Sequence, residues 1–172
     1  RMLEGGEDPR FVARRMAIFA SEDVGNADPN ALLLAAAAVQ VVDFIGMPES
    51  FYTLSQLAAY LALAPKSDGA KRALGKAQSL VSQHGPLPTP LKIRNAPTEM
   101  MKGLGYGTGY NYPHDYEGGF SPEGYLPDKI QGERLYEPVN RGFEKELSRR
   151  LNELMEKRRQ AEGKQPPSRR EA

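Results

Sequence analysis

The sequence predicts a mainly α fold: a bundle of helices, or helices packed orthogonally, with a long ordered loop rich in proline, glycine and tyrosine. Two observations predict this class. Apolar residues recur at helical spacing through most of residues 9–84. An N-cap residue followed by proline, which is a favoured way to start a helix, occurs at Asp8-Pro9 and again at Asp28-Pro29. The 172 residues are enough for one domain with its own core.

The first elements follow from these start signals. Residues 1–6 read as the end of a preceding helix, and with Arg1 in first place we expect the chain to be a fragment of a longer protein. A helix should begin at Asp8-Pro9, and another should run from Pro29 to Ile45. The second helix is apolar on nearly every face. We therefore expect it to be buried all round, at the centre of the scaffold or within a subunit interface.

Two more helices and a stiff strap come next. One helix is expected over 48–64, and another, capped by Ser67, over 67–85. The segment 85–97 contains prolines at 86, 88, 90 and 97, so it should be extended. Three apolar residues alternate along it as if one face were buried: Leu87, Leu91 and Ile93.

A loop of glycine and tyrosine follows a brief helix that Asn95 or Thr98 should cap. Glycine occupies every second position from Gly103 to Gly109, with tyrosines among and after them. Glycine tolerates backbone conformations that other residues avoid, so this run predicts an irregular loop. We expect its tyrosine rings, including that of Tyr112, to pack against the bundle and order it.

The last third of the chain predicts one long helix. Short aromatic and β-branched segments between Gly124 and Pro138 allow one small β-hairpin. Asn140 should then cap a helix that Gly163 ends, with an apolar stripe and a charged face on which Glu144 is expected to be solvated. The stripe consists of Phe143, Leu147, Leu151, Leu154 and Met155.

Composition excludes several classes of protein. The net charge is +1, so any basic patch must be local. There is no cysteine, which excludes disulfides and thiolate metal sites. No apolar run approaches the roughly 20 residues of a spanning helix, and no signal peptide opens the chain.

Catalytic and phosphate-binding motifs are weak in this chain. The glycine run lacks the preceding strand and the following Lys-Ser/Thr of a phosphate loop. His114-Asp115 could serve a small hydrolase, although Ser121 is the only serine nearby and no nucleophile motif surrounds it. With two histidines in all, an ordinary zinc site is not expected.

Cations and flat rings gather around the glycine-tyrosine loop. Single-strand nucleic-acid binding requires both, so the loop is a candidate for contact with nucleic acid or with a protein partner. The candidate contact residues are Lys92, Arg94, Lys102, Tyr106, Tyr110, Tyr112 and His114. The alternative is that the tyrosines only seal the loop.

Five phrases resemble, in order, one family: ASEDVGNADPNAL, LALAPKSD, LKIRNAPTEMMKGLGYG, YNYPHD and YEPVNRGFEKEL. The chain resembles the C-terminal part of the RarA/MgsA replication-associated recombination AAA+ ATPases, a family that includes the Werner-helicase-interacting protein. The resemblance covers nearly the whole chain. No G-x-x-x-x-G-K-[ST] occurs, so the family's ATPase module has no counterpart here.

The resemblance implies a function for the chain. It implies a C-terminal domain that assembles a clamp-loader-like ATPase into a homotetramer, with DNA and replication-fork proteins as partners of the full-length protein, in the cytoplasm at the nucleoid. It implies no catalytic residue and no cofactor here, since ATP and Mg²⁺ belong to the missing module. The expected divisions are the end of the lid-associated region (1–24), the oligomerisation domain (25–160) and a disordered tail (161–172). The alternative is a single-stranded nucleic-acid-binding module centred on the loop.

Overall fold

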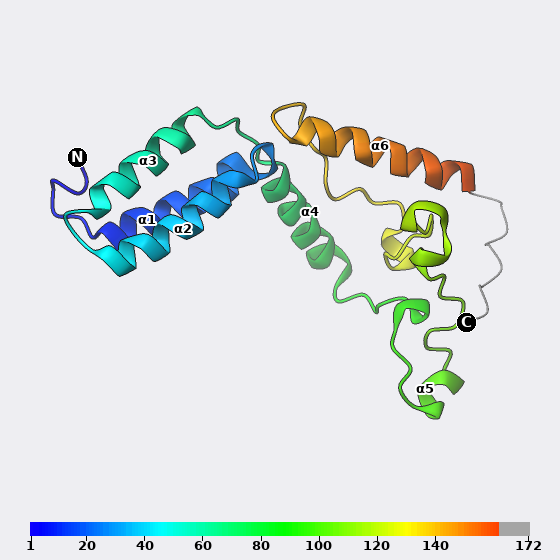
Figure 1. The fold of residues 1–172 in the computed structure, drawn as a ribbon. Coiled ribbons are helices and arrows are strands. Elements are labelled where there is room, and N and C mark those ends of the chain that lie inside the picture. Colours follow the sequence, from blue (N-terminus) through cyan, green and yellow to red (C-terminus); the bar gives the residue numbers. More distant parts are fainter. Residues whose placement is uncertain (162–172) are drawn as a thin grey trace. The chain divides into compact units, whose positions relative to one another are not determined.

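The computed structural model describes residues 1–161, which are mainly helical (Figure 1). This confirms the predicted fold class. The α-helices are α1 (Pro9–Phe19), α2 (Asn30–Ile45), α3 (Ser50–Leu63), α4 (Gly69–His84), α5 (Glu99–Gly103) and α6 (Glu144–Ala161). The described residues contain no β-strand, so the hairpin that the sequence allowed is not formed. Its middle is a 3₁₀ turn, Asp128–Ile130.

The chain divides into two compact units. Unit 1 comprises Arg1–Gly75 and Leu135–Ser148, and unit 2 comprises Lys76–Arg134 and the chain from Arg149 onward. The division passes through α4 and α6, so each of these helices contributes to both units. The predicted boundary between residues 24 and 25 stays a prediction.

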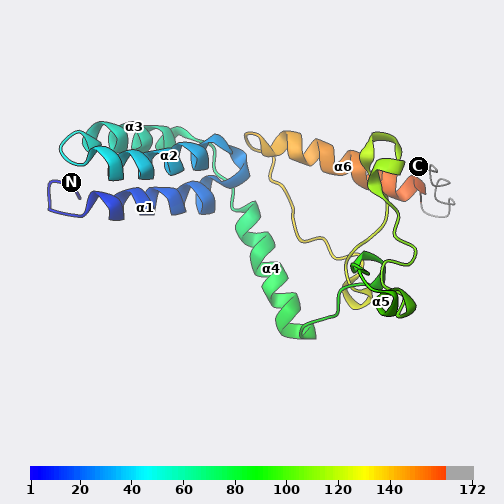
Figure 2. The same ribbon diagram turned by 60° about the horizontal axis from the view of Figure 1, so that its bottom comes forward.

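Helices α1, α2 and α3 of unit 1 lie side by side (Figures 1 and 2). The starts of α1 and α2 lie at the two predicted Asp-Pro signals. The Asp8 carboxylate accepts the Arg10 N–H at 2.8 Å, and the Asp28 carboxylate accepts the Asn30 N–H at 3.1 Å. At the other end of α2, Gly46 adopts a φ of 69°, which glycine tolerates and which stops the helix.

The core between these helices is built from small side chains. Alanines let the helix backbones approach closely, and the leucines of α3 fill the remaining space. The buried clusters consist of Ala20, Val24, Ala31, Ala35, Ala38, Leu57, Leu61 and Ala64, and of Val12, Ala13, Val42 and Leu54. Every fully buried hydrophobic residue of the described chain lies between Val12 and Ala64, which is within unit 1.

Unit 2 consists largely of loops and short turns. Thr98 caps α5 by accepting the Met101 N–H at 3.3 Å, as predicted. The proline strap differs from its prediction, because a 3₁₀ turn at Leu91–Ile93 breaks the alternation and leaves Leu91 exposed. Gly105, Gly107 and Gly109 of the loop all have positive φ, which accounts for the choice of glycine there.

The predictions for the two ends of the chain were partly wrong. Residues 2–6 are turns, in which the Gly6 N–H donates to the Leu3 carbonyl and the Glu7 N–H to the Met2 carbonyl, each at 3.0 Å. These bonds follow the pattern of a helix end with glycine at positive φ, as predicted. Asn140 does not cap the last helix, because α6 begins at Glu144. Gly163 and almost all of the tail predicted to be disordered lie outside the described residues.

Candidate functional site

The outward face of α2 carries its largest apolar side chains. Small residues line the inward face, where Ala31, Ala35 and Ala38 are buried. On a helical wheel five large residues group within roughly 120° next to this buried side, and all of them are exposed. They are Leu33, Leu34, Val41, Phe44 and Ile45, with Phe44 91% exposed. The prediction that α2 is buried all round is therefore wrong for the single chain, because the three-helix core needs only its alanine side.

A shallow groove of about 220 Å³ lies between α2 and α3, beside this face. Its lining is mainly apolar and includes Leu34, Val41 and Leu57. At one edge the Tyr60 hydroxyl donates to the Asp28 carboxylate at 2.6 Å, and this bond raises the pKa of Tyr60. On α3, Tyr52 and Leu63 project into solvent. We call the exposed side chains of α2 together with this groove the α2–α3 face.

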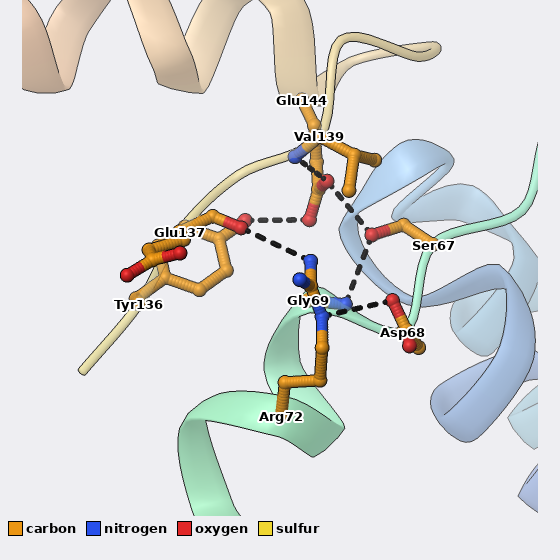
Figure 3. Close-up of polar contacts among 8 residues, drawn as sticks. All are labelled: Ser67, Asp68, Gly69, Arg72, Tyr136, Glu137, Val139 and Glu144. Atoms are coloured by element: carbon orange, nitrogen blue, oxygen red, sulfur yellow. Dashed lines mark hydrogen bonds and ion pairs between the residues drawn. The ribbon is translucent and has the colours of Figure 1, made fainter. Parts of the chain in front are cut away.

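A buried carboxylate joins distant segments of unit 1 (Figure 3). Glu144, at the start of α6, is 0% exposed. Its Oε2 accepts the Ser67 hydroxyl and the Val139 N–H, each at 2.7 Å, and its Oε1 accepts the Tyr136 hydroxyl at 2.7 Å. Ser67 Oγ in turn accepts the N–H of Gly69 at 3.1 Å, the first residue of α4. Three donors replace the water that a buried carboxylate loses, so this cluster fastens residues 135–148 to the three-helix core.

Three glycines allow the segments around the Glu144 cluster to approach each other closely. A Cβ at Gly142 would lie 2.1 Å from the Ala27 carbonyl oxygen, which also accepts the Phe143 N–H at 2.7 Å. At Gly69 a Cβ would lie 2.9 Å from Oε1 of Glu144, and at Gly25 one would lie 2.7 Å from the Ser67 carbonyl oxygen. Gly25 and Gly142 also have positive φ, so no other residue fits them without strain.

The surroundings of Tyr136 in the cluster raise the pKa of its hydroxyl. Burial raises the pKa of its hydroxyl, and the hydrogen bond to Glu144 raises it further. The hydroxyl also accepts from Asn26 Nδ2 at 3.1 Å, which acts in the opposite direction on the pKa. Tyr136 therefore stays protonated and donates to the carboxylate at neutral pH.

Sequence reasoning missed this cluster and placed Glu144 on a solvated face. The only local signal is that Glu144 follows Asn140-Arg141-Gly142, a turn sequence at a helix start. Its partners Ser67 and Tyr136 come from separate segments, and no spacing rule links them to it.

In unit 2 the predicted cations support the loop. Arg94 donates through Nε to the Thr89 carbonyl at 2.7 Å and through Nη1 to the Tyr106 hydroxyl at 3.2 Å. Its guanidinium lies 5.1 Å from the centroid of the Tyr106 ring. Lys92 pairs with Glu123 at 3.1 Å and lies 5.5 Å from the centroid of the Tyr125 ring.

A hollow of about 620 Å³ opens beside these residues. It brings together the predicted residues Lys92, Arg94 and Tyr110 and adds Tyr125, which sequence reasoning did not select. A second hollow of about 760 Å³ lies along the proline strap and shares Lys92 and Arg94 with the first. Three of the seven predicted contact residues, Lys92, Arg94 and Tyr110, therefore line one hollow together.

The remaining predicted residues lie outside the linings of these hollows. Lys102 pairs with Glu99 on α5 at 2.6 Å. Tyr112 is 52% exposed, so the expectation that its ring is buried is wrong. Its ring centroid lies 5.0 Å from that of the exposed His114. Ser121, the nucleophile considered with His114, is buried, and this gives the hydrolase interpretation no support.

The described residues offer neither a metal-binding cluster nor a membrane-spanning helix. Within 1–161, no three His, Asp or Glu side chains are grouped so that they could hold a metal ion. None of the helices in that range is long and apolar enough to cross a bilayer.

Comparison with known proteins gives consistent matches. The sequence model of the family described as "MgsA AAA+ ATPase C terminal" matches residues 1–155. Replication-associated recombination protein A of Coxiella burnetii is 45% identical over 152 residues, covering 88% of this chain and 34% of that protein. The protein of the same name from Escherichia coli K12 is 40% identical over 157 residues, covering 91% and 35%.

A eukaryotic relative matches the same region. ATPase WRNIP1 of Dictyostelium discoideum is 44% identical over 138 residues, covering 80% of this chain and 16% of that protein. The chain thus spans about a third or less of the length of these curated relatives.

Proposed function

The chain belongs to the MgsA AAA+ ATPase C-terminal family, and from this membership and the α2–α3 face we propose that it is the self-association domain of a clamp-loader-like AAA+ ATPase. The observation that supports this most directly is the orientation of α2. Its alanines face the core, whereas its large apolar side chains, such as Leu33, Val41 and Phe44, are exposed to solvent. A helix of a protein that remains a monomer turns its large apolar residues toward the core. An exposed apolar face of this kind marks an interface.

The occupant that fits this face best is a second copy of the chain. The net charge of +1 offers little long-range repulsion between copies. Around a two-fold axis each copy presents both projecting rings, such as Phe44, and the apolar α2–α3 groove, so the same patch can act as both knob and hole. Two-fold dimers and tetramers built from them are the commonest closed assemblies. The number four comes from the resemblance to the family.

The wider role of the full-length protein is also a proposal. Two relatives are named replication-associated recombination proteins, which supports a role for the whole protein at DNA replication forks in recombination and repair. We place ATP hydrolysis and Mg²⁺ in the ATPase module, contacts with DNA and fork proteins in the full-length protein, and the protein in the cytoplasm at the nucleoid. This chain contributes assembly and no catalytic residue.

Light scattering coupled to gel filtration tests self-association. At micromolar concentration and moderate salt we expect a mass near four chains. A mass near the 19.0 kDa of one chain would refute the proposal. A stable dimer would retain the interface and reject the tetramer.

Calorimetry tests whether ATP binding is absent from this chain, as expected if it belongs to the ATPase module. The chain has no phosphate loop, so we expect no heat of binding when ATP and Mg²⁺ are added at micromolar protein concentration. Saturable ATP binding would contradict the assignment of nucleotide chemistry to the missing module.

A further inference from the structure

We propose that the hollows of unit 2 form a groove for single-stranded nucleic acid, in which Arg94 receives a phosphate and Tyr110 and Tyr125 stack against bases. This site is independent of the α2–α3 face, which lies in unit 1. Every residue that carries the inference belongs to unit 2.

The first observation is a half-buried cation that lacks a counter-charge. Both hydrogen-bond acceptors of Arg94 are neutral, namely the Thr89 carbonyl and the Tyr106 hydroxyl. Among the described side chains, no carboxylate lies within ion-pair distance of its guanidinium, whereas Lys92 is paired with Glu123. A guanidinium has five N–H donors, and these two bonds leave three for an anion. Arg94 is therefore held in place with both charge and donors available.

The second observation is the extent of the groove. Lys92 and Arg94 line both the hollow of about 620 Å³ and the hollow of about 760 Å³, so the two hollows adjoin at these cations. Lys129 lines the second hollow, next to Asp128, and adds a positive charge to that of Arg94. Cations in the linings of two adjoining hollows suit an extended polyanion better than a single small anion.

The third observation indicates which polyanion would bind. Tyr110 and Tyr125 line the first hollow beside the cations, and Gly107 forms part of its wall. Tyrosine rings stack on unpaired bases, which a duplex keeps inside its own stack. An acidic peptide could satisfy Arg94 but has no base for these rings. Single-stranded nucleic acid is the ligand that uses both features.

Fluorescence anisotropy of the full 172-residue chain tests the inference. The probe is a fluorescein-labelled oligodeoxythymidylate of about twelve nucleotides, within the site sizes of single-strand-binding folds. We expect binding that weakens as salt rises from about 50 to 200 mM, with a logarithmic slope of about −1.4 for two phosphate contacts, at Arg94 and Lys129, because Lys92 is already paired with Glu123. A duplex of the same length should bind more weakly. An unlabelled polyglutamate should compete poorly.

Two pairs of variants separate the groove from the rest of the loop. Arg94→Gln should weaken binding about tenfold, the scale of a lost charge-assisted hydrogen bond. Its control is Lys102→Gln, which removes the same charge from α5, outside both linings, and should have little effect. Tyr110→Leu should weaken binding about tenfold through lost stacking. Its control is Tyr112→Leu, which alters a ring outside the hollows.

Because Arg94 also supports the loop, Lys129→Gln provides a charge change at an exposed position of the groove. It should leave the circular dichroism spectrum unchanged and reduce the salt slope by about 0.7. The inference is overturned if no binding occurs at micromolar protein, if the control variants weaken binding as much as the groove variants, or if polyglutamate competes as well as the oligonucleotide. None of these outcomes bears on the mass measured by light scattering, so the two proposals fail separately.

Discussion

Glu144 lies in a charged stretch of sequence, yet it holds separate segments of unit 1 together through its hydrogen bonds. Replacing it with alanine removes the shared acceptor of three donors, of which the Ser67 hydroxyl is buried and the Tyr136 hydroxyl and Val139 N–H are partly buried. Each unsatisfied buried donor costs about 1–3 kcal/mol, so we expect Glu144→Ala to lower the free energy of unfolding by at least about 3 kcal/mol. Glu144→Gln keeps one acceptor oxygen and should cost about 1–2 kcal/mol.

Urea denaturation followed by circular dichroism measures these changes in the free energy of unfolding. Glu156→Ala is the matched control, because it removes a carboxylate from an exposed position of the same helix and should change stability by less than about 0.5 kcal/mol. Equal effects of the alanine substitutions at 144 and 156 would show that the buried cluster contributes nothing.

Gly142 provides a second test at the residue scale. Gly142 and Gly109 both have positive φ, so alanine at either should cost about 1–2 kcal/mol in backbone strain. At Gly142 the new Cβ also meets the Ala27 carbonyl oxygen, whereas at Gly109 it meets no atom within 4 Å. We expect Gly142→Ala to be the more destabilising by at least about 1 kcal/mol, since close contacts of this kind force the backbone to shift. Thermal unfolding of the two variants gives the comparison, and similar melting temperatures would contradict the close approach.

Sequence reasoning succeeded for residues whose partners are local. Asp8, Asp28 and Thr98 bond to N–H groups two or three residues away, so a helix-start pattern identifies them. Glu144 bonds to Ser67, which is 77 residues earlier in the chain. Such pairing depends on how the segments pack, and a charged residue in a charged stretch gives no sign of it.

At the scale of elements, the start of α6 shows how packing overrides a local signal. Asn140 is a favourable N-cap residue, yet the helix begins at Glu144. The left-handed backbone of Gly142 aims the Phe143 N–H at the Ala27 carbonyl, and a helix starting at residue 141 would not allow this. The predicted hairpin is not formed in the described residues, because an isolated pair of short strands is only marginally stable without further strands or a helix packed against it.

Helix α2 leads to a prediction about the α2–α3 face. Phe44→Lys places a charge where the proposed interface excludes water, so self-association should weaken by at least about 2 kcal/mol, or about 30-fold. Ile18→Lys is the control, because it also adds a lysine at an exposed apolar position but lies on α1, outside the α2–α3 face. Sedimentation equilibrium measures both variants. An unchanged mass for Phe44→Lys, or an equal loss in both, would remove this face as the interface.

At the scale of the whole molecule, apolar surface and core are unevenly divided. The core of unit 1 is rich in alanine, and the described part of unit 2 has no fully buried hydrophobic residue. Large side chains such as Phe44 and Leu63, 91% and 87% exposed, are left outside. A chain of this size has limited surface to bury, so an assembly that covers these residues should contribute directly to its stability.

The last prediction follows from this coupling of assembly to stability. If the folded chain self-associates and the unfolded chain does not, each tenfold rise in protein concentration adds about 1 kcal/mol to the apparent stability of a subunit. For a chain of this length that amounts to about 2–4 °C in the midpoint of thermal unfolding. Scanning calorimetry over a hundredfold range of concentration should therefore show a steadily rising midpoint, while Phe44→Lys should give a lower midpoint that changes little. A wild-type midpoint that is constant over this range would mean that the exposed α2 residues tolerate solvent without a partner copy.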